Sequence, residues 1–206
     1  MSKVQLVWST PNMGAMVAYI ARVSNPNNQD NPKFEGLLNY MIRNQHWSPF
    51  EMVNVCMEIE TTRDIARQIL RHRSFTFQEF SQRYAESEDF VYSETRMQDE
   101  KNRQSSLPCT DKGTSDWWED VQSDVLIESL AAYQTAISLG IAKEVARKVL
   151  PEGLTMTRMY MNGTLRSWIH YVTLRTDEAT QKEHRKVAEQ CKAILTDLCP
   201  TIMKSL

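Results

Sequence analysis

Several common catalytic signatures are missing from this sequence of 206 residues. It has only six glycines, and no two are spaced as in the GxGxxG loop of dinucleotide-binding folds or in a phosphate-binding P-loop. HExxH, GxSxG and CxxC patterns are also absent, which excludes the usual signatures of zinc proteases, serine hydrolases and zinc ribbons. Any phosphate group would therefore have to be bound by side chains.

The sequence also lacks an excess of positive charge and a long apolar run. Its 24 Lys and Arg residues against 26 Asp and Glu residues give a net charge of −2, whereas dedicated nucleic-acid-binding domains usually carry a basic surplus. Residues 4–21 are uncharged but are interrupted by Gln5, Pro11 and Asn12. We therefore predict no nucleic-acid partner, no signal peptide and no membrane segment. With 41% hydrophobic residues, the length suits one domain spanning residues 1–206.

Cysteine is scarce and scattered. The four cysteines, Cys56, Cys109, Cys191 and Cys199, form no pair with metal-ligand spacing. We expect reduced thiols in a cytoplasm, either of a bacterium or of a host cell if the chain is virus-encoded, with neither disulfides nor a bound metal. Cys191 and Cys199 are expected in the core of the last helix.

The hydrophobic periodicity predicts an α+β fold, mostly helical, with a small antiparallel or mixed sheet. Residues 52–60 alternate between apolar and polar side chains, as in a half-buried strand, and residues 4–8 and 155–161 give weaker strand patterns. Gly140 is expected to end a long helix in a left-handed conformation. Residues 74–112 are expected to form loops. The helices are expected at 13–23, 34–42, 62–72, 115–139, 142–150 and 164–175 and within 178–206.

In the predicted helix 62–72, the apolar and charged residues separate onto two faces. Ile65, Ala66, Ile69 and Leu70 share one side. The opposite face carries Arg63, Asp64, Arg67, Gln68 and Arg71.

The segment from Arg71 to Tyr84 packs three arginines, one histidine and four aromatic residues into fourteen positions. Guanidinium groups bind phosphate or carboxylate oxygens in pairs, and aromatic rings stack on bases or ring cofactors. Only Glu79 opposes the positive charge of this segment, so we expect an anionic ligand to neutralise it. The same positive charge discourages protonation of His72. From these residues alone two other interpretations stay open. One is a solvated arginine face over a phenylalanine core, and the other is an RNA-binding strand, although the glycines of an RRM strand are missing.

Arg71-His72-Arg73, followed by Ser81 and by Arg83-Tyr84, resembles the signature of the flavin-dependent (alternative) thymidylate synthases. The resemblance extends over nearly the whole chain, through residues 21–24, 46–51, 146–151 and 174–175. It implies reductive methylation of dUMP to dTMP without a protein nucleophile. The carbon would come from 5,10-methylenetetrahydrofolate and the electrons from NADPH, through FAD. It also implies that family's fold and a homotetramer whose sites are shared between subunits.

The resemblance assigns roles to individual residues. Catalytic roles fall to Arg175, which would orient and polarise the pyrimidine, and to His46, at the mouth of the flavin site. The residues expected around dUMP are Gln68, Arg71, Glu79, Phe80, Ser81, Gln82, Arg83, Arg147 and Arg175. The residues expected around FAD are Ser24, Ser48, Glu51, Arg71, His72, Arg73, Ser74, Gln78, Glu79, Arg166 and His170.

Some of these assignments have competing explanations. Arg175 could serve only as a cation at a helix C-terminus, and His170 could be a structural histidine. Ser81 is assigned to binding, because a nucleophilic serine needs a base beside it and the sequence places none there. Gln78 and His170 also differ from the Asn that many members of the family carry.

Two alternatives concern the whole protein. The first is a nucleotide- or RNA-binding module that uses the same arginines without redox chemistry. The second is a flavoprotein that oxidises NADPH without methylating anything.

Overall fold

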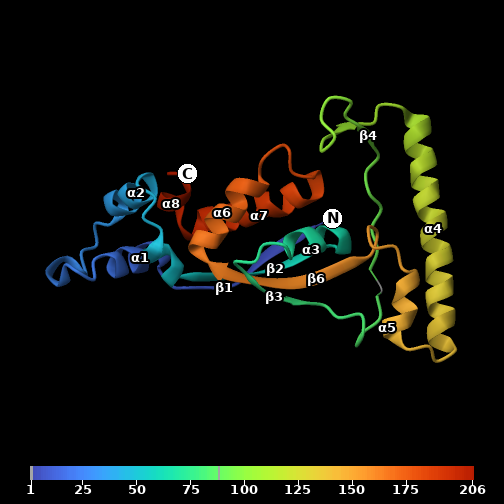
Figure 1. Ribbon diagram of the computed structural model, residues 1–206, viewed down its shortest axis with the longest axis horizontal. Coiled ribbons are helices and arrows are strands. Elements are labelled where there is room, and N and C mark those ends of the chain that lie inside the picture. The colour runs from blue at the N-terminus through green and yellow to red at the C-terminus, as the bar shows by residue number, and fades with distance from the viewer. Residues whose placement is uncertain (1, 88) are drawn as a thin grey trace.

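The computed structural model describes residues 2–87 and 89–206, and its centre is a four-stranded antiparallel sheet (Figure 1). The strand order is β1-β2-β6-β3. These strands are β1 (Lys3–Ser9), β2 (Asn54–Thr62), β6 (Met156–Thr164) and β3 (Thr76–Glu79). A separate ladder pairs β4 (Arg96–Gln98) with β5 (Ser106–Pro108).

The helices are distributed over one face and both ends of this sheet (Figure 1). Helices α6 (Leu165–Arg175) and α7 (Lys182–Leu198) cover one face, together with α3 (Arg63–Ile69). One end of the molecule is formed by α1 (Met13–Ala21), α2 (Glu35–Arg43) and α8 (Pro200–Met203). The opposite end is formed by α4 (Lys112–Ser138) and α5 (Lys143–Ala146). Short 3-10 turns lie at η1 (Pro26–Asn28), η2 (Ser48–Met52) and η3 (Arg147–Val149).

The alternating pattern of β2 decides which face of the sheet is covered. Val55, Met57 and Ile59 are fully buried beneath the helices, and each such side chain contributes about 2 kcal/mol of hydrophobic stabilisation. The indole N–H of Trp168 on α6 donates to the carbonyl of Val55 at 3.0 Å, which fixes that helix to the sheet. The other face remains open, with Trp8 47% exposed.

The sequence predictions of fold class and of most elements are confirmed. The alternating run lies in β2, and the helix predicted at 164–175 is α6. Asp111 caps α4 by accepting from the backbone N–H of Thr114 at 2.8 Å, and Gly140 follows it with a φ of +79°. The helix expected at 142–150 divides into α5 and η3, and the tail forms α7 and α8. No helix in the described part of the chain is both long and apolar enough to cross a membrane.

Two predictions near the arginine-rich segment are wrong. Residues 74–112 are not all loop, because they contain β3, β4 and β5, and the helix expected to reach His72 ends at Ile69. For β3 and the early end of the helix, the physical reason is a close contact between Phe75 and Gly163 in β6. A Cβ at Gly163 would lie 2.7 Å from Phe75 Cε1, so only glycine leaves room for the ring. The chain therefore leaves the helix early and joins the sheet.

Candidate active site

Arg175 and His72 meet at the centre of the predicted site. Arg175, the last residue of α6, donates its Nε–H to His72 Nε2 at 3.0 Å. His72 must then carry its proton on Nδ1. Burial lowers the pKa of His72 to about 4, and the charge of Arg175 adds to the effect. His72 is therefore neutral near pH 7, as its arginine-rich surroundings suggested, although burial is the larger cause.

A cavity of about 600 Å³ lies beside this pair. Three residues of the predicted set line it, namely Gln68, His170 and Arg175, together with Gln104 and Gln181. The cavity thus collects residues from α3, α6 and the hairpin that joins β4 to β5. Arg175 does more here than end a helix, because its side chain both binds His72 and faces the cavity.

Glu51 and Arg166, two of the predicted flavin contacts, form an ion pair. Arg166 Nη1 donates to Glu51 Oε1 at 2.7 Å, and Thr164 Oγ donates to Glu51 Oε2 at 2.8 Å. These bonds, with the Arg166 bond contributing most, lower the pKa of Glu51. Thr164 also caps α6 by accepting from the backbone N–H of Ser167. Sequence reasoning missed this role of Thr164, although its position at the start of a predicted helix was a usable signal.

Glu79 is surrounded by cations of its own chain. Arg67 Nη1 lies 3.4 Å from Glu79 Oε2, Arg63 Nη1 lies 3.6 Å from Oε1, and Thr157 donates to Oε1 at 3.1 Å. The expectation that Arg63 shares the polar face of its helix is wrong, since its side chain is only 8% exposed against 48% for Arg67. Because α3 starts directly where β2 ends, its first residue lies against the sheet beside Glu79.

Two of the three arginines of the signature, Arg71 and Arg73, stay available for a ligand. Arg71, Arg73 and Ser74 are exposed. Neither Arg71 nor Arg73 forms an ion pair with any residue among 2–87 and 89–206. Gln78 is likewise exposed, on β3. Exposed guanidinium groups without a carboxylate partner are suited to bind an anionic group.

The later part of the signature lies toward α5. Arg83 Nε is 3.2 Å from Glu144 Oε2 on α5, and Arg147 lies in η3 directly after that helix. Ser81 Oγ accepts from the backbone N–H of Arg83 at 3.4 Å. Gln82 is buried and donates to Ser87 Oγ at 2.6 Å, and Phe80, two residues earlier, is half-buried.

Other predicted residues lie at the opposite end of the molecule. Ser24 follows α1, and His46 and Ser48 follow α2. The His46 ring is exposed and packs edge-on against Tyr40, with 5.7 Å between the ring centres. Since α1 and α2 are far from α5 in the fold, one chain does not bring all the predicted residues into one cavity (Figure 1).

The structure adds a buried histidine that sequence reasoning missed. His184 on α7 is fully buried, with Nδ1 3.3 Å from Gln68 Oε1 and Nε2 3.2 Å from the Tyr171 hydroxyl. Burial lowers the pKa of His184 to about 3, with the charge of Arg175 adding to the effect. Its spacing from Val187 and Cys191 placed it on the apolar face of that helix, and this signal was available in the sequence.

Three of the four cysteines are buried thiols with raised pKa values, which disfavours a role as nucleophile. All four are free, and Cys191 and Cys199 are buried in the core as predicted. Burial raises the pKa of Cys199 to about 11 and also raises the pKa values of Cys56 and Cys191. Within the described residues, no group of His, Cys, Asp or Glu side chains is arranged to hold a metal ion.

Fold and sequence comparisons agree on the class of protein. The fold is similar to that of the UMP/dUMP methylase PolB from Streptomyces cacaoi bound with 5-Br dUMP, with a TM-score of 0.86 and 27% identity over 100% of this chain and 94% of that one. Residues 5–201 match the family described as thymidylate synthase complementing protein. The chain therefore belongs to the flavin-dependent thymidylate synthase family.

Two relatives show how strong this similarity is. The flavin-dependent thymidylate synthase of Synechocystis sp. is 51% identical over 191 residues, which are 93% of this chain and 88% of the relative. A probable flavin-dependent thymidylate synthase of Paramecium bursaria Chlorella virus 1 is 49% identical over 193 residues, which are 93% of this chain and 89% of the relative.

Proposed function

We propose that the chain is a methyltransferase that converts dUMP to dTMP. In this proposal 5,10-methylenetetrahydrofolate supplies the carbon, and NADPH supplies the electrons through FAD. The observation that carries it is the similarity, at 51% identity over 93% of the chain, to a protein named flavin-dependent thymidylate synthase. The similar fold of a methylase bound with 5-Br dUMP supports the choice of nucleotide.

The exposed arginines fit the charge of FAD. The pyrophosphate of FAD is anionic, and Arg71 and Arg73 are exposed cations without a carboxylate partner among the described residues. Glu51 keeps Arg166 in one orientation, so that its remaining N–H groups can donate to a cofactor. When bound, FAD would supply the two-electron chemistry that the side chains of this protein lack.

Arg175 is the residue that we propose acts on the pyrimidine. Its Nε–H is bound by neutral His72, which leaves the terminal guanidinium nitrogens for a carbonyl oxygen of the base. A fixed cation there would stabilise the negative charge that the ring gains during attack. We propose His46 as the second catalytic residue, because its exposed ring can approach a ligand from the side of α2.

An anaerobic assay with FAD, NADPH and methylenetetrahydrofolate tests the reaction. The purified protein should be yellow, NADPH should bleach it, and dUMP should become dTMP. Arg175→Ala should abolish dTMP formation while FAD stays bound, and Arg185→Ala on α7 provides a matched control that should keep activity. A colourless protein would support a binding module instead. NADPH oxidation without tritium release from labelled dUMP would indicate a flavoprotein that does not methylate.

We also propose a homotetramer whose sites are shared between subunits. The predicted residues lie at opposite ends of one chain, so sites between copies would bring complementary sets together. Two exposed apolar surfaces could form the contacts. One is the open face of the sheet, where Tyr160 is 38% exposed, and the other is α4, where Trp117 is 61% exposed. Free thiols in all four cysteines fit a reducing, cytoplasmic location.

Mixing two inactive variants tests the shared site. His46→Ala and Arg83→Ala alter residues at opposite ends of the fold, so a mixed tetramer would contain some sites with neither change. Refolding the two variants together should restore part of the activity, whereas refolding either alone should not. Light scattering on a sizing column should give four chains per particle. A stable monomer that binds FAD, or mixtures that stay inactive, would contradict the shared site.

A further inference from the structure

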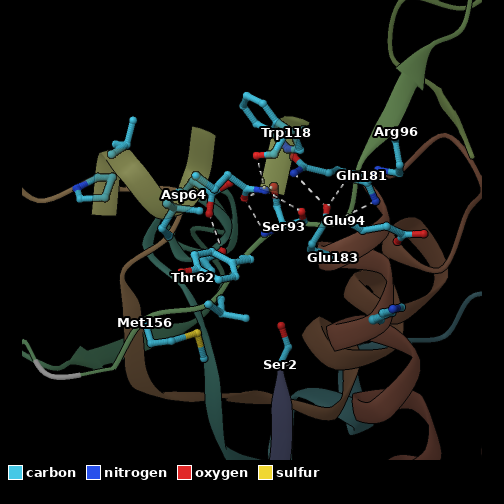
Figure 2. Close-up of a pocket in the computed structure, with 18 of the residues that line it drawn as sticks. Ser2, Thr62, Asp64, Ser93, Glu94, Arg96, Trp118, Met156, Gln181 and Glu183 are labelled. Carbon is cyan, nitrogen blue, oxygen red and sulfur yellow. Dashed lines mark hydrogen bonds and ion pairs between the residues drawn. The ribbon is translucent and has the colours of Figure 1, made fainter. Parts of the chain in front are cut away.

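Polar side chains connect the cavity beside Arg175 to a second cavity of about 1100 Å³. Gln181, directly before α7, lines both cavities. Figure 2 shows Gln181, Glu183 and Arg96 close together on the wall of the larger one. Arg96 Nη2 donates to Glu183 Oε2 at 2.9 Å, which ties β4 to the start of α7. This contact attaches part of the segment 74–112, which was expected to form loops, to the site.

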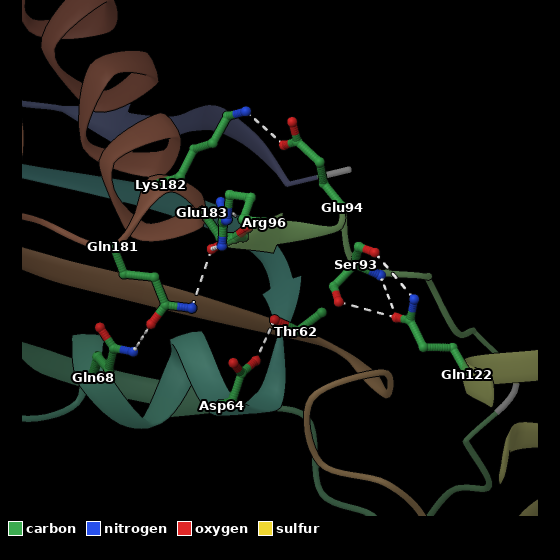
Figure 3. Close-up of polar contacts among 10 residues, drawn as sticks. All are labelled: Thr62, Asp64, Gln68, Ser93, Glu94, Arg96, Gln122, Gln181, Lys182 and Glu183. Carbon is green, nitrogen blue, oxygen red and sulfur yellow. Dashed lines mark hydrogen bonds and ion pairs between the residues drawn. The ribbon is translucent and has the colours of Figure 1, made fainter. Parts of the chain in front are cut away.

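The connection continues as an unbroken series of hydrogen bonds, and Figure 3 shows its first part, from Glu183 through Gln181 to Gln68. Gln181 Nε2 donates to Glu183 Oε2 at 3.1 Å, and Gln68 Nε2 donates to Gln181 Oε1 at 2.7 Å. Beyond Gln68, its Oε1 lies 3.3 Å from His184 Nδ1, and His184 Nε2 lies 3.2 Å from the Tyr171 hydroxyl. The series therefore joins α7, α3 and α6.

The carboxylate of Glu183, at one end of the series, determines which partner donates in each hydrogen bond. Burial is the largest single influence and raises the pKa of Glu183. The hydrogen bonds from Arg96, from the backbone and from Gln181, together with the charge of Arg96, bring the net pKa below the ordinary value. An ionised carboxylate only accepts hydrogen bonds, so Gln181 must turn its NH2 to Glu183 and its oxygen to Gln68. Gln68 must then turn its oxygen to His184, which carries its proton on Nδ1 and accepts from Tyr171 on Nε2.

We propose that Glu183 is a positioning residue that fixes the amide of Gln68, so that Gln68 offers the nucleotide a hydrogen-bond donor and not an acceptor. The Gln68 oxygen is occupied by His184, and one of its N–H groups is occupied by Gln181. The second N–H remains, on a residue that lines the cavity beside Arg175. A donor suits the phosphate, hydroxyl and carbonyl oxygens of a nucleotide, whereas a flipped amide would present oxygen against oxygen. The proposal rests on the proposed function, which identifies the ligand as dUMP.

Glu183→Gln tests the direction without changing the shape of the side chain. Arg96 contacts both carboxylate oxygens, with Nη1 2.7 Å from Oε1 and Nη2 2.9 Å from Oε2. Because Arg96 has only donors, we expect the oxygen of the new amide to stay at the shorter contact with Nη1, which places the NH2 at the Oε2 position facing Gln181. Every bond in the series would then reverse, and His184 would carry its proton on Nε2. We expect ¹⁵N NMR of the histidine-labelled holoenzyme to show Nδ1–H at His184 in the original protein and Nε2–H in the variant. The dissociation constant for dUMP, measured by calorimetry, should rise about tenfold.

The neighbouring ion pair between Lys182 and Glu94 provides a matched control. Lys182 Nζ lies 2.5 Å from Glu94 Oε2, so this pair also attaches the segment before β4 to α7, but it is not part of the hydrogen-bonded series. Glu94→Gln should therefore leave both the His184 tautomer and dUMP binding unchanged. The proposal is overturned by an Nε2–H imidazole at His184 in the original protein, by an Nδ1–H imidazole in Glu183→Gln, or by equal effects of the two variants. These measurements need no turnover, so a protein that binds dUMP but forms no dTMP would contradict only the proposed function.

Discussion

The contact between Gly163 and Phe75 predicts that Gly163→Ala damages both stability and the site. The added Cβ would lie 2.7 Å from Phe75 Cε1 and 3.2 Å from Cγ, which is closer than packed carbon atoms approach. The ring cannot move aside freely, because it packs against Trp168 with 4.9 Å between ring centres and against Tyr171 with 6.0 Å. We therefore expect the upper part of the overpacking range, about 3 kcal/mol. For a chain of this size that lowers Tm by roughly 6–12 °C.

Thermal unfolding followed by circular dichroism checks this value at a fixed chain concentration, because ligands and association also shift Tm. FAD retained per chain, read from visible absorbance, should fall as well, since Phe75 directly follows His72, Arg73 and Ser74. Gly36→Ala in α2 is the control, because a Cβ there meets nothing within 4 Å and should leave Tm equal or slightly higher. If Gly163→Ala melts within about 2 °C of the original protein, the contact does not hold the segment in place.

Three further predictions follow from buried polar groups. The free energy of unfolding should fall as pH drops from 6.5 to about 4, because unfolded His72 takes up a proton there that folded His72 does not. His184 contributes in the same direction, because burial lowers its pKa to about 3, so His184→Asn should flatten this dependence in urea titrations at several pH values; an unchanged slope would refute the reasoning. Arg63→Met should lower the free energy of unfolding by about 3 kcal/mol, because Glu79 then lacks its buried cation. Arg67→Met, at an exposed residue, should lower it by less than about 1 kcal/mol, and equal urea midpoints for the two variants would contradict this difference. A thiol reagent added to the native protein should modify only Cys109, because the other three thiols are buried; fast modification of a second thiol would count against the packing.

The sequence predicted the elements whose pattern is local. β2 was predicted from alternation alone, and the end of α4 from Gly140. β3 could not be predicted in the same way, because four residues give little periodicity and their partner β6 lies far along the chain. The burial of Arg63 depends on the same pairing, which brings Glu79 beside it. A helical wheel records only the residues of one helix and cannot supply a neighbour from a distant strand.

For the site, the sequence identified residue types better than their partners. The family resemblance named His72 and Arg175 separately, but their direct hydrogen bond depends on how α6 ends against the segment after α3. Glu183 and His184 belong to no motif that we recognised, since their role comes from the positions of amides on other helices. Hydrogen bonds between side chains on different helices depend on tertiary packing, so they could not be predicted from the sequence alone.

Helix α4 has a consequence for how the active protein forms. Of its residues in the described structure, only Gln122 and Tyr133 are buried, and Ile127 is 63% exposed. In the proposed tetramer such apolar side chains would find cover only after chains collide, whereas the sheet can form within one chain. Recovery of activity after denaturation should therefore accelerate with protein concentration, while recovery of secondary structure should not. An expression host that makes little of the protein would then accumulate folded but inactive chains.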